Sequence, residues 1–132
     1  MTLLRPAVLA LAALLLLLPL AGAAEAQSRQ LTGAEIAEVL TGNTAVGDWE
    51  GARFRQLYRE DGTTLHTRTD GARGEGIWRV SENGLYEESW DGGETWTAWT
   101  VRRVAGRLVF LGRDLPTTPF AVEPGDTTFE PG

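Results

Sequence analysis

The sequence contains no cysteine and no lysine, since all 12 of its basic residues are arginines, and its single histidine is His66. Without cysteine, thiol nucleophiles, disulfides and thiolate metal sites are excluded. Without lysine, Schiff-base chemistry is excluded. One imidazole would need carboxylates to complete a zinc site, which is an uncommon ligand set, so we expect no metal and no cofactor.

Basic residues are also in the minority, because 18 acidic residues give a formal net charge of -6. A protein that binds nucleic acid relies on cationic contacts to phosphate, so we expect no nucleic-acid partner. One long apolar run, Ala7 to Leu20, follows Arg5 and precedes small residues. This order is typical of a secretory signal peptide, and the run is shorter than the roughly 20 residues of a membrane span.

We therefore predict a signal peptide over residues 1–26 and a protein that is exported, either to the periplasm or out of the cell, with no stable membrane span after cleavage. Two cleavage sites remain open, after Ala24 and after Ala26. An exported domain without cysteine fits a bacterial cell envelope better than a disulfide-rich extracellular scaffold. The remaining chain has the length of one small domain with one modest core.

One short helix and then a series of strands are predicted after the signal peptide. Thr32 and Glu35 have the spacing of a capping box, and Ile36, Val39 and Leu40 follow at helical spacing. From residue 44 onwards, turn signals recur about every ten residues, as in an antiparallel meander. Six strand-like runs lie between them, at residues 52–59, 63–69, 76–80, 85–90, 95–104 and 107–111. The sequence thus predicts that residues 27–113 form a β-domain that begins with a short helix.

The register of one hairpin can be predicted from its side chains. A three-residue loop with Gly84 in the left-handed position would pair Val80 with Tyr86 and Arg79 with Glu87. That register gives one apolar face, shared by Trp78, Val80, Tyr86 and Trp90, and one cross-strand ion pair. A two-residue loop would mix apolar and polar side chains on each face, so we prefer the longer one.

The last segment, residues 114–132, has a different composition and contains four of the six prolines. Proline cannot donate a hydrogen bond to a β-ladder, so we predict an extended tail or edge cover rather than a central strand. Phe120, Val122 and Phe129 are the residues expected to hold it against the sheet. The stretch after Pro124 has the composition of a disordered chain end.

Several short motifs resemble a family of small exported bacterial domains of unknown function. The resemblance covers roughly residues 31–112 and implies a compact antiparallel sheet or a lipocalin-like half-barrel of about six strands. Many members carry a cysteine where this chain has Glu87, so no disulfide is implied here. The motifs are Leu31-Thr32-Gly33-Ala34-Glu35-Ile36, Gly42-Asn43-Thr44, Tyr58-x-x-Asp61-Gly62-Thr63, Gly76-x-Trp78-Arg79-Val80 and Tyr86 to Trp90.

A second resemblance is local. Residues 89–96, Ser-Trp-Asp-Gly-Gly-Glu-Thr-Trp, look like the Asp-box, the S-x-D-x-G-x-T-W hairpin of sialidase-type propellers. That family uses the hairpin structurally, and one copy in a short chain is too little for a propeller. The resemblance therefore implies a tight turn at Asp91 to Glu94. The carboxylates of Asp91 and Glu94 are too few for a Ca²⁺ site, because Ca²⁺ prefers six to eight oxygen ligands.

Tryptophan is the most distinctive residue type, with four of the five indoles inside residues 78–99. Exposed indoles would form a stacking platform for a flat ligand, whereas buried indoles would fill the core of a domain that is short of leucine and isoleucine. Trp96 and Trp99 differ by three positions, so on a regular strand they point to opposite faces. The candidate ligand-binding residues are Trp78, Arg79, Trp90, Trp96 and Trp99.

No catalytic motif is present. Glu87 and Glu88 are adjacent on a predicted strand and so point apart, and we interpret them as solvated charges. His66 lies in a polar run without a G-x-S-x-G nucleophile motif, and we interpret it as a surface residue.

The predicted function is a non-enzymatic, exported β-domain that binds a small ligand or an envelope protein through its aromatic-rich sheet. One alternative is a glycan hydrolase or lyase that uses two carboxylates. The other is an interaction or inhibitor domain whose exposed edge, residues 107–111, accepts a strand from its partner.

Overall fold

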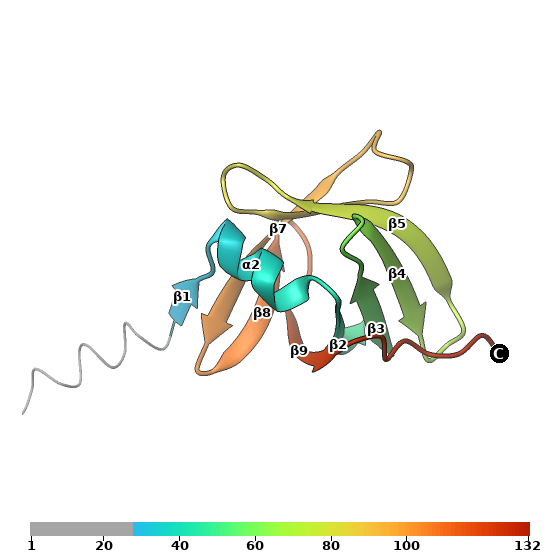
Figure 1. Ribbon diagram of the computed structural model, residues 1–132. Coiled ribbons are helices and arrows are strands. Elements are labelled where there is room, and N and C mark those ends of the chain that lie inside the picture. Colours follow the sequence, from blue (N-terminus) through green and yellow to red (C-terminus); the bar gives the residue numbers. More distant parts are fainter. Residues whose placement is uncertain (1–27) are drawn as a thin grey trace, which may run out of the picture.

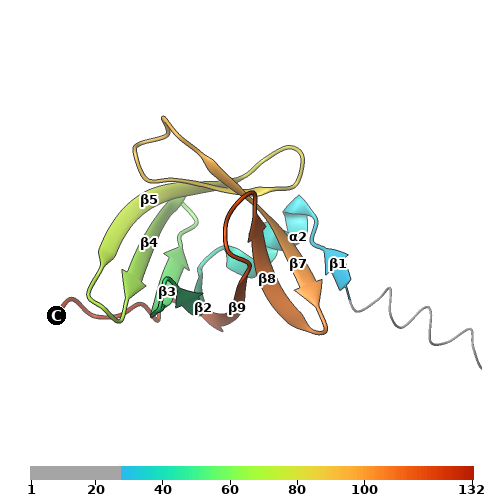
Figure 2. The same cartoon turned by 180° about the vertical axis from the view of Figure 1, so that it is seen from behind.

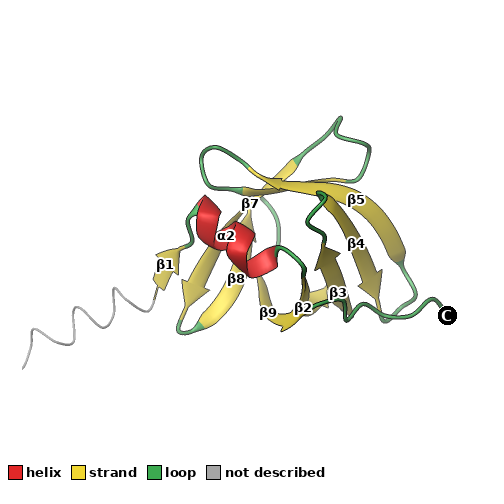
Figure 3. Cartoon of the chain, viewed as in Figure 1, coloured by secondary structure: helices red, strands yellow, loops and turns green. Residues whose placement is uncertain are grey.

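The computed structural model describes residues 28–132, so the predicted signal peptide and its cleavage sites lie outside the described residues. The described part contains one short helix and nine strands (Figure 1, Figure 3). The elements are β1 (Ser28–Gln30), α2 (Gly33–Leu40), β2 (Asn43–Trp49), β3 (Ala52–Tyr58), β4 (Thr63–Arg68), β5 (Arg73–Val80), β6 (Tyr86–Ser89), β7 (Thr97–Val104), β8 (Arg107–Gly112) and β9 (Thr118–Pro124).

Eight of the strands form a closed antiparallel barrel. Each strand from β2 to β8 pairs with the next strand along the chain, and β9 returns to pair with β2. The short strand β1 pairs with residues 102–104, at the C-terminal end of β7, and is not part of this ring. The mainly β, lipocalin-like fold is therefore confirmed, but the sheet closes fully and has more than the six predicted strands.

The missed strands contain residues that usually mark turns. Gly47 lies inside β2, where a Cβ atom would come within 2.7 Å of the Pro119 carbonyl oxygen and 2.9 Å of the Phe54 ring. Gly47 is thus required by close packing, and the turn comes later, at Glu50-Gly51, where both φ angles are positive. In β9, Pro119 lies just before the residues paired with β2, and Pro124 ends that pairing. The prolines therefore lie near the two ends of β9, within a strand of the barrel that we predicted as an extended tail or edge cover.

The closure of the barrel also removes the proposed free edge at residues 107–111. Strand β8 pairs with β7 on one side and with β9 on the other (Figure 2). The backbone groups that would accept a partner strand are engaged within the protein. The strand-edge alternative loses the edge on which it depended.

The local predictions at the helix and at one hairpin are confirmed. Thr32 and Glu35 exchange the two hydrogen bonds of a capping box at the start of α2. In the β5–β6 hairpin, Val80 pairs with Tyr86 and Arg79 pairs with Glu87, whose carboxylate lies 2.7 Å from the Arg79 Nε.

Helix α2 covers one end of the barrel. Its buried residues Ile36 and Leu40 belong to the hydrophobic core, and Gly33 lies against Val80 at the β5–β6 turn. Turns alternate between the two ends of an up-and-down barrel, so the β2–β3, β4–β5, β6–β7 and β8–β9 turns lie at the end away from the helix. Figure 1 shows α2 beside the β5–β6 turn and far from the β4–β5 turn.

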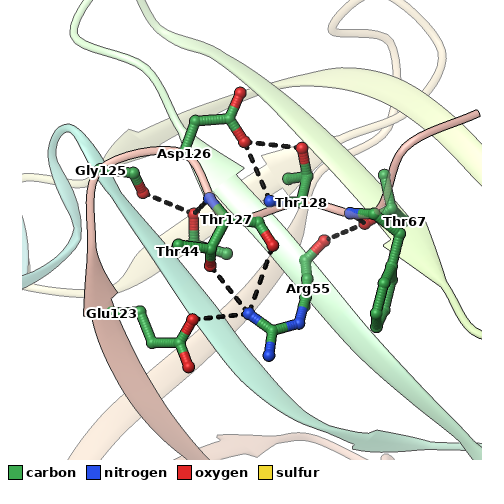
Figure 4. Close-up of polar contacts among 9 residues, drawn as sticks. Thr44, Arg55, Thr67, Glu123, Gly125, Asp126, Thr127 and Thr128 are labelled. Carbon is green, nitrogen blue, oxygen red and sulfur yellow. Dashed lines mark hydrogen bonds and ion pairs between the residues drawn. The ribbon is translucent and has the colours of Figure 1, made fainter.

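After β9, residues 125–130 form an ordered C-terminal strap on the outside of the barrel (Figure 4). The Thr44 hydroxyl donates to the Gly125 carbonyl and accepts from the Thr127 N–H, and the Thr67 hydroxyl accepts from the Phe129 N–H. Arg55 donates to the carbonyl and the hydroxyl of Thr127. The predicted disorder after Pro124 is therefore wrong, because side chains of β2, β3 and β4 satisfy the backbone of the strap.

Candidate functional site

The barrel contains a cavity of about 370 Å³ at the end away from helix α2. Its wall comes from strands all around the ring and from the β4–β5 turn. The lining residues are Trp49, Phe54, Gln56, Tyr58, His66, Arg68, Ala72, Arg73, Gly74, Tyr86, Glu88, Trp90, Trp99, Phe110 and Thr118. We call this space the barrel cavity.

Aromatic rings make up most of the cavity wall. Phe54 stacks on the His66 imidazole with 5.5 Å between ring centroids, and Trp90 meets the same imidazole edge to face at 6.1 Å. Trp90 is 43% exposed, which places it at the mouth, whereas Trp99 is only 7% exposed and lies deeper. The cavity thus combines a solvent-exposed indole at its entrance with buried rings inside.

A chain of hydrogen bonds fixes the orientation of the polar side chains in the cavity. The Thr64 hydroxyl donates its proton to the Leu57 carbonyl, so its oxygen can only accept a second hydrogen bond. The Gln56 side-chain atom 2.9 Å from this oxygen must therefore be the amide nitrogen, which is a donor. The amide oxygen then faces His66, 3.0 Å from Nδ1. Because an amide oxygen only accepts, Nδ1 carries the proton and Nε2 is left as an acceptor.

Burial keeps this imidazole neutral. It lowers the pKa of His66 to about 4, and the positive charge of Arg68 acts in the same direction. At neutral pH His66 therefore presents an uncharged ring with a lone pair on Nε2.

A second polar group lies deeper in the barrel. The Tyr86 hydroxyl donates to Oε2 of Glu88, and the hydroxyls of Tyr58 and Tyr86 lie 3.1 Å apart. The Gln56 amide nitrogen is 3.3 Å from the same carboxylate oxygen, which links this group to the hydrogen-bond chain of His66. Burial raises the pKa of both phenols well above the ordinary value, so both stay protonated.

Two arginines line the mouth, and both have partners. Arg68 pairs with Asp70 at 3.0 Å and with Glu50 at 4.0 Å, and its side chain is 11% exposed. Arg73 donates to the Phe129 carbonyl of the C-terminal strap at 2.8 Å. Arg68 is thus held by acidic partners and Arg73 by the C-terminal strap, while the charge of Arg68 still acts on His66.

One donor of the wall has no acceptor. Trp99 Nε1 is the one buried side-chain nitrogen or oxygen without a hydrogen-bond partner in residues 28–132. A buried N–H without an acceptor costs about 1–3 kcal/mol. Because this nitrogen is fully buried, its N–H is not open to the cavity.

The five predicted site residues fall into three groups. Trp90 and Trp99 line the barrel cavity. Trp78 is buried against Tyr58, with 5.2 Å between ring centroids, and its Nε1 donates to the Arg59 carbonyl at 2.9 Å. Trp96 and Arg79 lie together away from the cavity, where the guanidinium carbon is 3.6 Å from the indole centroid.

Residues 89–96 form the tight turn that their sequence predicts. Asp91 Oδ1 accepts from the Ser89 hydroxyl at 2.8 Å and from the Thr95 N–H at 2.9 Å. The Ser89 oxygen accepts from the Gly93 N–H, and Trp96 Nε1 donates to the Gly93 carbonyl at 3.0 Å. These bonds hold the loop between β6 and β7, next to Trp90 at the cavity mouth.

The polar side chains of the barrel cavity were not predicted from the sequence. His66 and Glu88 were interpreted as surface residues, but both line the barrel cavity. Strand alternation carried the signal, because Glu88 lies between Tyr86 and Trp90, which share the apolar face. The expected divergence of Glu87 and Glu88 is confirmed, with Glu87 paired to Arg79 on the outside.

The described cavity wall holds one carboxylate, Glu88, so it lacks the second acid that glycosidases normally use. Residues 28–132 contain no cluster of three or more histidine, aspartate or glutamate side chains that could hold a metal ion. Among the same residues, no helix is long and apolar enough to cross a membrane.

No protein-family model, curated protein or solved structure matches the chain.

Proposed function

We propose that this chain is an exported ligand-binding domain of the bacterial envelope, without catalytic activity, that holds a small and largely apolar molecule in the barrel cavity. The observation that carries the proposal is the cavity itself. Its volume of about 370 Å³ lies in the range of small-molecule sites, and its aromatic wall includes a few oriented polar groups. Trp90 at the mouth and the deeper ring of Trp99 are the expected contacts of the ligand.

The proposal is tested by titrating the protein without its signal peptide with N-phenyl-1-naphthylamine, a neutral dye whose fluorescence rises in apolar surroundings. We expect saturable binding at one site per chain. Substitution of Ala72, at the mouth, by tryptophan should block entry and abolish the signal.

Two tryptophans near the same turn give a matched pair of variants. Trp90→Ala removes a cavity wall and should weaken dye binding, while Trp96→Ala removes an indole that packs on Arg79 outside the cavity and should leave it unchanged. Equal effects of the two variants, or dye binding that survives Ala72→Trp, would place the dye elsewhere and overturn the proposal.

A further inference from the structure

The carboxylate inside the barrel cavity has no cationic partner. Glu88 takes part in none of the ion pairs found among residues 28–132, and its hydrogen-bond donors there are the neutral groups of Tyr86 and Gln56. Both of these donors bond to Oε2. Oε1 is not among the buried atoms that lack a partner, so it retains accessible surface. An anionic oxygen is therefore open at the cavity wall.

A second acceptor belongs to the same wall. The hydrogen bond between Gln56 and His66 places the imidazole proton on Nδ1, so the lone pair on Nε2 can accept a hydrogen bond. The Glu88 carboxylate and the imidazole ring are connected through the Gln56 amide, which bonds to Nδ1 on the other side of the ring. The polar part of the wall thus offers two acceptors, one of them charged.

The aromatic part of the wall also favours positive charge. Aromatic faces attract cations, and the wall includes the rings of Trp49, Phe54, Trp90, Trp99 and Phe110. Neither arginine of the mouth forms an ion pair with Glu88, since Arg68 is paired with acidic residues and Arg73 donates to a carbonyl of the C-terminal strap. A carboxylate within an aromatic wall is suited to an organic ammonium group.

We infer that the ligand of the barrel cavity is an organic amine: an apolar or aromatic body with a protonated amino group that donates hydrogen bonds to Glu88 Oε1 and His66 Nε2. This inference rests on the proposed function and specifies its ligand class.

The test uses three probes with the same ring and different charge, namely 2-phenylethylamine, 2-phenylethanol and phenylacetate. Their affinities are measured at neutral pH by displacement of N-phenyl-1-naphthylamine. We expect the amine to bind about tenfold more tightly than the alcohol, and the acid to bind most weakly.

Two neighbouring substitutions assign the effect to the carboxylate. Glu88→Gln keeps an acceptor for Tyr86 but removes the charge, so the amine should fall to the affinity of the alcohol while the alcohol is unchanged. Glu87→Gln, on the outer face beside Arg79, should leave the order of the three probes as it is. Far-ultraviolet circular dichroism verifies that each variant is folded.

Three outcomes would overturn the inference. Equal binding of amine and alcohol to the unsubstituted protein would show a cavity that does not select cations, and this result needs no variant. If Glu88→Gln still binds the amine more tightly than the alcohol, the preference for the amine comes from groups other than Glu88. In both cases dye binding still supports the proposed function, whereas failure of the dye and all three probes to bind would overturn both proposals.

Discussion

The Nδ1 atom of His66 lies 3.0 Å from the amide oxygen of Gln56, and this contact sets the tautomer of the imidazole inside the barrel. The orientation of the Gln56 amide is fixed by Thr64. The Thr64 hydroxyl donates to the Leu57 carbonyl and accepts from the Gln56 amide nitrogen, so the amide oxygen is left facing His66. A neutral histidine on a half-buried aromatic wall makes stability depend on pH.

Protonation of His66 should destabilise the fold in mild acid. Its pKa is about 4 in the folded protein and about 6.5 in the unfolded chain. Between these values the unfolded state binds more protons, so stability is lost as the pH falls from 6.5 toward 4. After allowance for the partial solvent access of the ring, the loss is about 2 kcal/mol. Urea unfolding at a series of pH values measures it.

The variant His66→Gln isolates this contribution, because glutamine does not titrate. Other groups near the ring, namely Glu88, Arg68 and Asp70, are unchanged in the variant and contribute to both pH profiles. We expect the variant to have a flatter profile between pH 6.5 and 4. Parallel profiles for the two proteins would contradict the assignment.

Gly76 should be intolerant of a side chain because it supports the cavity mouth. A Cβ atom there would lie 2.6 Å from the Ser89 carbonyl oxygen and 2.7 Å from the Trp90 ring. Gly76→Ala should therefore push Trp90 out of place, cost about 1–3 kcal/mol of stability and weaken dye binding. Gly74→Ala is the control, since a Cβ atom at that position meets nothing within 4 Å. Similar stability losses for both variants, by chemical denaturation, would refute this explanation.

The six strands that lie between turn signals could be predicted from the sequence, together with the helix cap and the register of the β5–β6 hairpin. Residues 52–59 and 85–90 each lie between turn signals, and the structure has strands at both places. Strands β2 and β9 could not be found in this way. Gly47 looks like a turn residue until the close approach of β9 is known, and Pro119 lies outside the residues paired with β2 and pairs with Val109 of β8.

The candidate site was harder to predict than the fold, since a barrel turns one face of every strand inward. Polar residues on that face lie in the cavity, although the same residues in an open sheet would be solvated. His66 and Glu88 were assigned to the surface for this reason. Strand parity places Glu88 on the face of Tyr86 and Trp90, but only closure of the ring converts that face into a cavity wall.

Ser89 should contribute strongly to the turn between β6 and β7. Its buried hydroxyl donates to Asp91 and accepts from the Gly93 N–H, so Ser89→Ala leaves a backbone donor without its partner. We expect a loss of about 1–3 kcal/mol. Ser81→Ala, which removes one weaker contact to the Leu85 N–H in the β5–β6 hairpin, should cost less. Thermal unfolding followed by tryptophan fluorescence measures both, and a reversed order would contradict the prediction.

Arg55 should fasten the C-terminal strap to the barrel. Its guanidinium lies 2.5 Å from the Glu123 carboxylate and 2.9 Å from the Thr127 hydroxyl, and its side chain is only 23% exposed. Arg55→Gln should therefore cost about 1 kcal/mol and expose the strap to proteases. Arg53→Gln is the matched control, because Arg53 makes only an exposed ion pair with Asp48. If limited proteolysis, read by mass spectrometry, trims both variants equally fast, Arg55 does not hold the strap.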